Sequence, residues 1–183
     1  MKFIRYFLIL VVAVFGVSAV DANAQRYTDT KNSSRTLEQK IFKQIINLPH
    51  YGVFDHIQYE LRGNTVILSG KVADARNKKD AEDVIEDLNG VQRVINNIEI
   101  LPPSGFDNSI RRRILRTYAD SGLYRYLQEP KPSVRIIVDG GRVELEGYVI
   151  NRGDYNLMRI LANGVSGVFS VKNNLLVEKE DVR

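Results

Sequence analysis

The sequence predicts an α+β fold made of two copies of one small unit, ordered helix, strand, strand, helix, strand. Three observations carry this prediction. Positions 57 to 100 align without a gap to positions lying 77 residues later in the chain. In each copy, apolar and polar residues alternate on both sides of a glycine-containing turn, which is the pattern of a β-hairpin. Apolar residues at helical spacing precede and follow each hairpin. We therefore expect two domains, each with a small three-stranded mixed sheet packed against two helices.

The repeated positions are of the residue types that form turns and apolar cores. None of the identical residues is a nucleophile, an acid, a base or a metal ligand. The repeat therefore indicates a copied fold and favours a binding module over an enzyme. The identical pairs are Gly63/Gly140, Val66/Val143, Leu68/Leu145, Gly70/Gly147, Val72/Val149, Gly90/Gly167, Val91/Val168, Val94/Val171, Asn96/Asn173 and Asn97/Asn174.

The helices are predicted from apolar stripes with a period near 3.6 residues. In the first unit these stripes lie at 37–48 and 81–88, and Asp74 can cap the second of the two helices. In the second unit they start at 110 and at 158. The first helices align 69 rather than 77 positions apart, so the second unit carries eight extra residues. This insert lies within Tyr118–Ser133.

The strands are predicted from alternation and from turn residues. The hairpins turn at Gly63–Asn64 and Gly140–Gly141, and the last strands run over 91–100 and 168–177. Gly70 and Gly147 lie inside strands, where glycine indicates a bulge or the close approach of a helix. Asn96-Asn97 and Asn173-Asn174, in the last strands, are interpreted as structural cross-links to a neighbouring loop through their side-chain amides, with ligand contact as the alternative.

The first residues have the pattern of a cleavable secretory signal. A basic start is followed by the apolar run Phe7–Phe15 and by Ala22-Asn23-Ala24, which favours cleavage after Ala24 and export to the periplasm. The alternative, an uncleaved membrane anchor, is disfavoured because the run is short for a span. The chain has no cysteine for lipid attachment. The expected boundaries are a signal peptide at 1–24, a flexible N-terminus at 25–35, a first domain at 36–101, a linker at 102–105, a second domain at 106–178 and a tail at 179–183.

The repeated motif resembles the BON domain. Its pattern is Val-x-Leu-x-Gly-x-Val, a helix, and then Gly-Val-x-x-Val-x-Asn. It occurs as Val66, Leu68, Gly70, Val72, Gly90, Val91, Val94 and Asn96, and again as Val143, Leu145, Gly147, Val149, Gly167, Val168, Val171 and Asn173. Two such domains behind a secretory signal are similar to the osmotically inducible periplasmic proteins. The resemblance implies a non-enzymatic protein that maintains the cell envelope under stress through anionic phospholipid.

The two second helices differ on the side away from their apolar stripe. Lys78, Asp80, Glu82, Asp83, Glu86 and Asp87 of the first unit align with Tyr155, Leu157, Arg159, Ile160, Asn163 and Gly164 of the second. Leu157 and Ile160 are three residues apart and share a face, with Arg152 and Arg159 beside it. An apolar face flanked by arginines suits an anionic membrane surface or a protein partner. The alternative is that this face packs on the first domain or under the longer loop of its own domain.

A second candidate surface is basic. Arg111, Arg112, Arg113 and Arg116 crowd the first helix of the second unit, and the insert adds Tyr124 and Arg125. Tyrosines beside arginines favour the membrane–water interface, and each basic side chain near an anionic surface contributes roughly 1 kcal/mol. The alternative is a solvated charged face, with the tyrosines and leucines of the insert capping the local core. Residues 36–101 carry a net charge of −2 and residues 106–178 a net charge of +3.

Other function classes find little support in the sequence. The only two histidines, His50 and His56, lie in one loop, and we predict no catalytic, cofactor or metal site. A net charge of +4 is too weak to argue for nucleic acid. The leading hypothesis is weak binding of anionic phospholipid through the second domain. The rival is a protein-interaction or chaperone-like module for envelope proteins. A third possibility is a structural protein whose domains bury these faces on each other.

Overall fold

The computed structural model describes residues 34–128 and 131–178. The predicted signal peptide at 1–24 and the tail at 179–183 lie outside the described residues, as does the predicted flexible N-terminus up to residue 33. Residues 34–45 are helical, so the predicted helix at 37–48 is present in the described part of the chain. None of the helices in this described part of the chain is long and apolar enough to cross a membrane.

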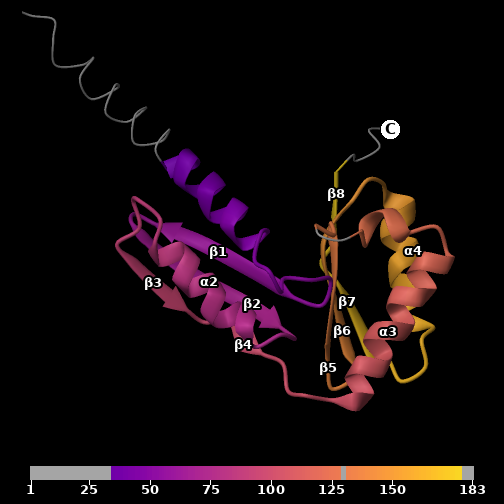
Figure 1. The fold of residues 1–183 in the computed structure, drawn as a ribbon. Helices are drawn as coiled ribbons and strands as arrows, with labels where there is room; N and C mark the ends of the chain where they lie inside the picture. The colour runs from indigo at the N-terminus through magenta and orange to yellow at the C-terminus, as the bar shows by residue number, and fades with distance from the viewer. Residues whose placement is uncertain (1–33, 129–130, 179–183) are drawn as a thin grey trace, which may run out of the picture. The chain divides into compact units, whose positions relative to one another are not determined.

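The first repeat contains the predicted elements, with its last strand in two pieces. After the helix at 34–45 come β1 (His56–Arg62), β2 (Thr65–Val72), α2 (Arg76–Glu86), β3 (Arg93–Asn96) and β4 (Glu99–Ile100). The central strand is β2, which pairs antiparallel with β1 and parallel with both β3 and β4. The predicted mixed sheet is therefore confirmed (Figure 1).

The second repeat has the same topology around a central β6. Its elements are α3 (Gly105–Asp120), the 3-10 turn η1 (Tyr124–Tyr126), β5 (Val134–Asp139), β6 (Arg142–Val149), α4 (Arg152–Asn163), β7 (Ser170–Asn173) and β8 (Leu176–Val177). The strand β6 pairs antiparallel with β5 and parallel with β7 and β8. The predicted insert contains η1. Both repeats are thus α+β units of the predicted kind.

An asparagine side chain makes the break in each last strand. The amide nitrogen of Asn96 donates to the Lys78 carbonyl oxygen at 2.8 Å, and its amide oxygen accepts from Ile98 N at 3.1 Å. Asn173 does the same, donating to Tyr155 O and accepting from Leu175 N. Each asparagine therefore ties its strand to the second helix of its own repeat. The structural interpretation of Asn96 and Asn173 is confirmed, but the expected partner was wrong, because each side chain reaches a helix and not a neighbouring loop.

Each sheet buries one face under its two helices. The first core includes Ile41, Leu68 and Ile85, and the second is larger because the insert adds apolar side chains to it. These side chains are completely buried, and burying one of this size contributes about 1.5–3 kcal/mol. In the second repeat α3 and α4 lie together on the same face of the sheet (Figure 1). The sides of α3 and α4 that face away from the sheet consequently form the outer surface of the second repeat on this side.

Gly70 and Gly147 are required by a neighbouring strand. Both have positive φ, 110° and 107°. A Cβ atom at Gly70 would lie 2.2 Å from the His56 carbonyl oxygen, and one at Gly147 would lie 2.0 Å from that of Ser133. Each glycine thus lets the start of one hairpin strand approach the end of the other. The close approach that the sequence indicated is real, but its source is strand backbone rather than a helix.

The loop that precedes β1 contacts the second repeat. Residues 37–183 form a single unit that contains both repeats. Val53, 6% exposed, belongs to the core of the second repeat, and its carbonyl oxygen accepts from Ile136 N at 2.8 Å. The Arg135 guanidinium lies 4.2 Å from the centre of the Tyr51 ring and donates to Gly52 O at 2.7 Å. The first repeat therefore covers part of the outer edge of β5.

Candidate functional site

Helix α4 is fixed at its N-terminus by side chains from its own first turn and from the insert. Asn151 caps the helix by accepting from Asp154 N at 2.8 Å. The Asp154 carboxylate accepts in turn from Arg125 at 2.7 Å and from the Tyr126 hydroxyl at 2.5 Å. A carboxylate in the first turn also complements the helix dipole. The position of α4, and of the face it presents, is thus set by these polar contacts.

The outer face of α4 exposes the two apolar residues that the sequence singled out. Ile160 is 59% exposed and Leu157 is 37% exposed, whereas Met158 on the inner face is completely buried. Neither alternative for this face, packing on the first domain or under the insert, hides Ile160. Arg159 is exposed beside it. The structure therefore leaves this face available to another molecule.

Tyr155 and Arg152 have a partly structural role. The Tyr155 ring is half-buried against the core, and its hydroxyl donates to Asn173 O at 3.4 Å. The Arg152 guanidinium lies 4.4 Å from the centre of this ring, in a cation–π contact. Tyr155 thus supports the helix, and it holds the charge of Arg152 at the helix N-terminus.

The equivalent face of α2 is acidic, and two of its carboxylates are paired with side chains of the same repeat. Lys79 and Asp83 form an ion pair with a nitrogen–oxygen distance of 2.6 Å, four residues apart on the helix. Glu82 accepts from Asn96, which also holds the last strand. Where α4 has Leu157 and Ile160, α2 thus carries Asp80 and Asp83. The two repeats differ in their outer helical surface more than in their cores.

The arginines of α3 divide between structure and surface. Arg111 is buried, 4% exposed, and donates to the Val138 carbonyl oxygen. Burial lowers the pKa of its guanidinium, against the attraction of Asp107. Arg113 is exposed and donates to Ser166 O at 2.8 Å, while Arg112 and Arg116 are exposed on the outer side of the helix. The predicted basic surface is therefore made by three of the four arginines.

Most of the insert caps the core, as one of the alternatives held. Tyr118, Leu123, Tyr126 and Leu127 are buried in the core of the second repeat. Tyr124 is the exception, with 56% of its surface exposed. Arg125 forms an ion pair with Asp154, and its guanidinium lies 4.7 Å from the centre of the Tyr126 ring. About half of its side chain is exposed to an outside partner. The insert thus adds one exposed tyrosine to the candidate surface.

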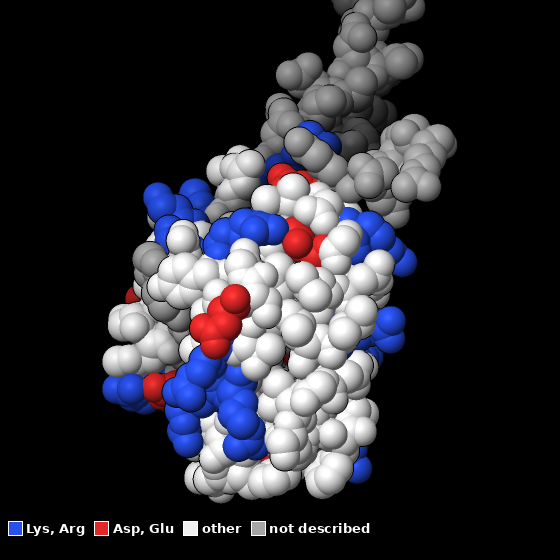
Figure 2. Space-filling model, turned by 90° about the vertical axis from the view of Figure 1, so that its right-hand side faces the viewer, with Lys and Arg blue, Asp and Glu red and all other residues white. Residues whose placement is uncertain are grey.

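The outer helical layer of the second repeat is shown in Figure 2. Blue side chains gather toward the lower left of this view, and a broad area without charged residues lies beside them. Acidic side chains are few on this face. Basic and uncharged surface therefore adjoin on the side where α3 and α4 lie.

Comparison with known proteins identifies the repeated unit. A family model for the BON domain matches residues 33–102 and residues 106–179, which together are most of the chain. The chain belongs to the BON domain family. The BON domain is a non-catalytic domain family. No curated protein matches the sequence.

Two solved structures similar to this BON protein are of CdsD, a structural protein of the type III secretion system of Chlamydia trachomatis. The C-terminal domain of CdsD is 13% identical, the match covers 77% of this chain and 96% of that one, and the TM-score is 0.31. A second CdsD structure is also 13% identical, with 80% and 94% covered and a TM-score of 0.32.

The second BON domain exposes a pair of aromatic residues that the sequence pattern did not predict. Phe106 is 48% exposed and Phe169 is 74% exposed, and their ring centres are 6.1 Å apart. The available signal was the repeat itself, since Phe169 stands where the first BON domain has Gln92. A phenylalanine that replaces a polar residue of the other copy is a candidate for surface function.

A groove of about 870 Å³ lies on the helix-free faces of the two sheets. Its lining carries both charges, and Lys71 binds Glu144 across it at 2.8 Å. His56 lies in the same groove, 3.7 Å from Glu146. Within residues 34–128 and 131–178, no group of three or more acidic or histidine side chains could hold a metal ion. The groove presents paired charges rather than a converging set of ligands.

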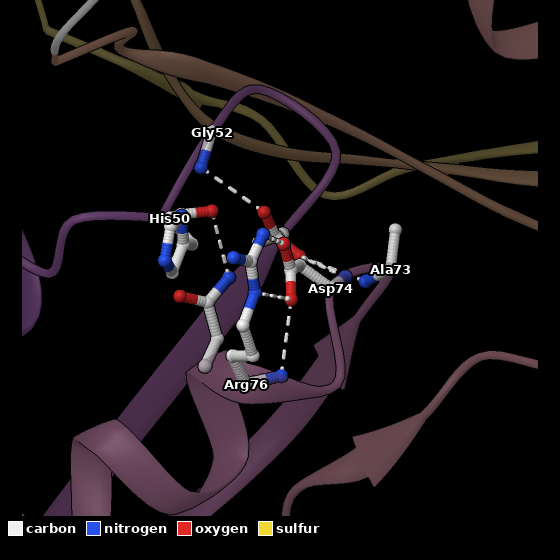
Figure 3. A network of polar contacts seen from close by, with 7 residues as sticks. His50, Gly52, Ala73, Asp74 and Arg76 are labelled. Carbon is white, nitrogen blue, oxygen red and sulfur yellow. Dashed lines mark hydrogen bonds and ion pairs between the residues drawn. The ribbon is translucent and has the colours of Figure 1, made fainter.

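The second histidine belongs to a separate network that fixes the loop before β1 (Figure 3). The buried Asp55 carboxylate accepts from the backbone nitrogens of Gly52, Ala73 and Asp74 at 3.0, 2.7 and 3.2 Å. His50 contributes its backbone carbonyl oxygen, which accepts from Asn77 at 2.9 Å. Hydrogen bonds from Arg76 lower the pKa of Asp74 to about 2. This network is structural, because it shapes the loop that places Val53 against the second BON domain.

Proposed function

We propose that this protein is a non-enzymatic envelope protein that binds the surface of anionic phospholipid membranes, weakly and reversibly, through its second BON domain. BON domains are associated with phospholipid membranes and with envelope proteins. The secretory pattern of the first residues supports the part of the proposal that concerns location, since an exported protein would meet such membranes in the periplasm. The contact is peripheral and uses the outer faces of α3 and α4.

One observation carries the proposal. Helix α4 exposes Leu157 and Ile160 beside arginines. The aligned positions of α2 carry acidic residues instead. A single exposed apolar side chain is common on protein surfaces, but two that share one helix face and adjoin arginines form a patch of the kind that marks an interaction site. An apolar stripe with cationic flanks matches the boundary between headgroups and acyl chains.

Electrostatics supports the same surface. The second BON domain has a net charge of +3 over residues 106–178, and the exposed Arg112, Arg113 and Arg116 lie on the helix beside α4. Each arginine near an anionic surface contributes roughly 1 kcal/mol. A few such contacts give binding that is reversible and that weakens as salt screens the charges.

Sedimentation with vesicles tests the proposal. The chain without residues 1–24 should sediment with phosphatidylglycerol vesicles and not with phosphatidylcholine vesicles. Binding should weaken steeply as the salt concentration rises from about 0.05 M to about 0.5 M. The double variant Leu157→Asp/Ile160→Asp should bind roughly tenfold or more weakly, because it places two carboxylates against anionic headgroups.

The matched control is Gln44→Asp/Gln92→Asp, which makes the same change of net charge at exposed positions of the first BON domain. This control should bind nearly as well as the unmodified chain. Circular dichroism would establish that both variants are folded. If the unmodified chain failed to sediment with either vesicle, the lipid proposal would be wrong, and the exposed face of α4 would be assigned to a protein partner.

A further inference from the structure

Two phenylalanine rings form a small apolar projection at one end of the second BON domain. Phe106 comes from the first turn of α3, and Phe169 comes from the loop before β7. Their rings lie at 33° to each other, and Phe169 is the most exposed of the large apolar side chains in the described residues. The pair unites two segments that are far apart in the sequence.

The fold reserves space for these rings. A Cβ atom at Gly141 would lie 2.6 Å from the ring of Phe169, and one at Gly167 would lie 3.2 Å from that of Phe106. Both glycines have positive φ, 74° and 90°, so a side chain is disfavoured there for two reasons. The rings therefore rest on glycine backbone, with their other sides facing solvent.

The same end of the domain is held rigid by a buried carboxylate. Asp107 is 4% exposed and accepts from the backbone nitrogens of Gly140 and Gly141 at 3.0 and 2.8 Å. The Gly141 carbonyl oxygen in turn accepts from Phe169 N at 2.9 Å. The start of α3, the hairpin turn and the loop before β7 are thus joined through one set of hydrogen bonds. The aromatic pair is part of a fixed surface.

The first BON domain has no such projection. The counterpart of Phe106 is Leu37, which is 9% exposed and packs over Gly90, and the counterpart of Phe169 is the exposed Gln92. The arginine beside the rings is also absent, because Gln44 aligns with Arg113. The aromatic pair and its charge are therefore features of the second domain and not requirements of the fold.

Basic side chains border the pair. The Arg113 guanidinium lies against Gly167 and donates to Ser166 O at 2.8 Å, which places its charge next to the Phe106 ring. Arg142 extends along the hairpin turn at Gly140. Cations beside exposed aromatic rings complement a surface whose outer layer is anionic and whose interior is apolar. Of the possible partners, this charge pattern favours an anionic membrane.

We infer that Phe106 and Phe169 are the part of this protein that enters the acyl-chain boundary of an anionic membrane, with Arg113 and Arg142 at the headgroups. The inference rests on the proposed function and adds to it a defined point of insertion. It also separates two contributions: the outer face of α4 lies on the membrane surface, and the aromatic pair penetrates it.

Fluorescence can test the insertion directly because the chain has no tryptophan. In the Phe169→Trp variant, binding to phosphatidylglycerol vesicles should shift the emission to shorter wavelength, and lipids brominated on their acyl chains should quench it. The matched reporter is Tyr148→Trp, which replaces a 53% exposed side chain on the helix-free side of the same domain. Its emission should neither shift nor be quenched.

Removal of the rings gives the second measurement. The Phe106→Ser/Phe169→Ser variant should bind the vesicles roughly tenfold or more weakly, whereas Ile100→Ser, at a 47% exposed apolar residue of the first domain, should bind normally. Vesicle binding with an unquenched Phe169→Trp reporter would overturn this inference and leave the proposed function intact. Absence of vesicle binding would overturn both. An emission shift that depends on protein concentration and not on lipid would assign the pair to protein–protein contact instead.

Discussion

At the scale of single residues, His56 is a group whose protonation the fold opposes near neutral pH. Burial in the groove lowers the pKa of His56 below its ordinary value near 6.5, and Glu146, with its carboxylate 3.7 Å away, only partly offsets this effect. Arg135 acts in the same direction as burial. The native protein therefore holds His56 neutral at a pH where the unfolded chain takes up a proton.

This difference predicts how stability depends on pH. Because the folded pKa is lower than the unfolded one, the unfolded state binds more protons once the pH falls toward about 6.5, and the free energy of unfolding decreases below that point. Replacing His56 with Gln should reduce this loss of stability between about pH 7.5 and pH 5.5. Urea unfolding at the two pH values measures it. His50→Gln, which removes an exposed histidine, should keep the dependence of the unmodified chain, and an equal change in both variants would refute the assignment to His56.

At the scale of elements, the order and type of the secondary structure could be predicted from the sequence because the apolar pattern occurs twice. The hairpins and α4 follow directly from alternation and helical spacing. The division of each last strand could not be predicted, since it depends on where the side chain of Asn96 or Asn173 finds a partner on a helix. The reason for glycine at position 70 could not be predicted either, because periodicity does not show that the His56 carbonyl oxygen lies against it.

The candidate site was predictable to a similar degree. The position of Ile160 off the core stripe of α4 followed from helical spacing, but its exposure did not, because packing on the first domain or under the insert was an open alternative. The burial of Arg111 could not be predicted, because an arginine in a charged cluster is expected on the surface. Only the fold brings the Val138 carbonyl oxygen to its guanidinium. Phe106 and Phe169 were missed because a lone phenylalanine is usually a core residue, and their pairing joins two distant segments.

The N-terminus of α4 provides a test of how this element is anchored. Partial burial acts to raise the pKa of Asp154, but hydrogen bonds from Tyr126 and Arg125 outweigh it, so the pKa lies below its usual range. Asp154→Asn should lower the free energy of unfolding by about 1–2 kcal/mol at neutral pH. The difference should shrink as the pH falls below about 4, since the carboxyl of the unfolded chain then takes up a proton, and it should be lost once the pH has also fallen below the lower pKa of the folded state.

Urea unfolding at neutral and acid pH measures this effect. The control is Asp120→Asn, which alters an exposed carboxylate at the end of α3 and should change stability little. If the two variants were equally stable at neutral pH, the contacts between the insert and α4 would have no net stabilising role.

At the scale of the whole molecule, the question is whether the two BON domains unfold together. Domains of this size have small cores, and no cysteine is available to cross-link them. The contact through the loop before β1 offers a different source of stability. Val53 completes the core of the second domain, and Arg135 ties that domain to Tyr51 and Gly52. We therefore expect the two domains to unfold in a single transition.

Val53→Asp should uncouple them, because it would bury an unpaired carboxylate in an apolar site at a cost of about 3 kcal/mol or more. The expected result in calorimetry is that one transition becomes two, the second domain melting at lower temperature and the first nearly unchanged. Val53→Ala, which removes two methyl groups and adds no charge, should lower the transition by less and leave it single. Two transitions in the unmodified chain would contradict the coupling. Independent domains would then leave the membrane-binding surface of the second domain to act without the first, and its vesicle binding should survive when Val53 is changed.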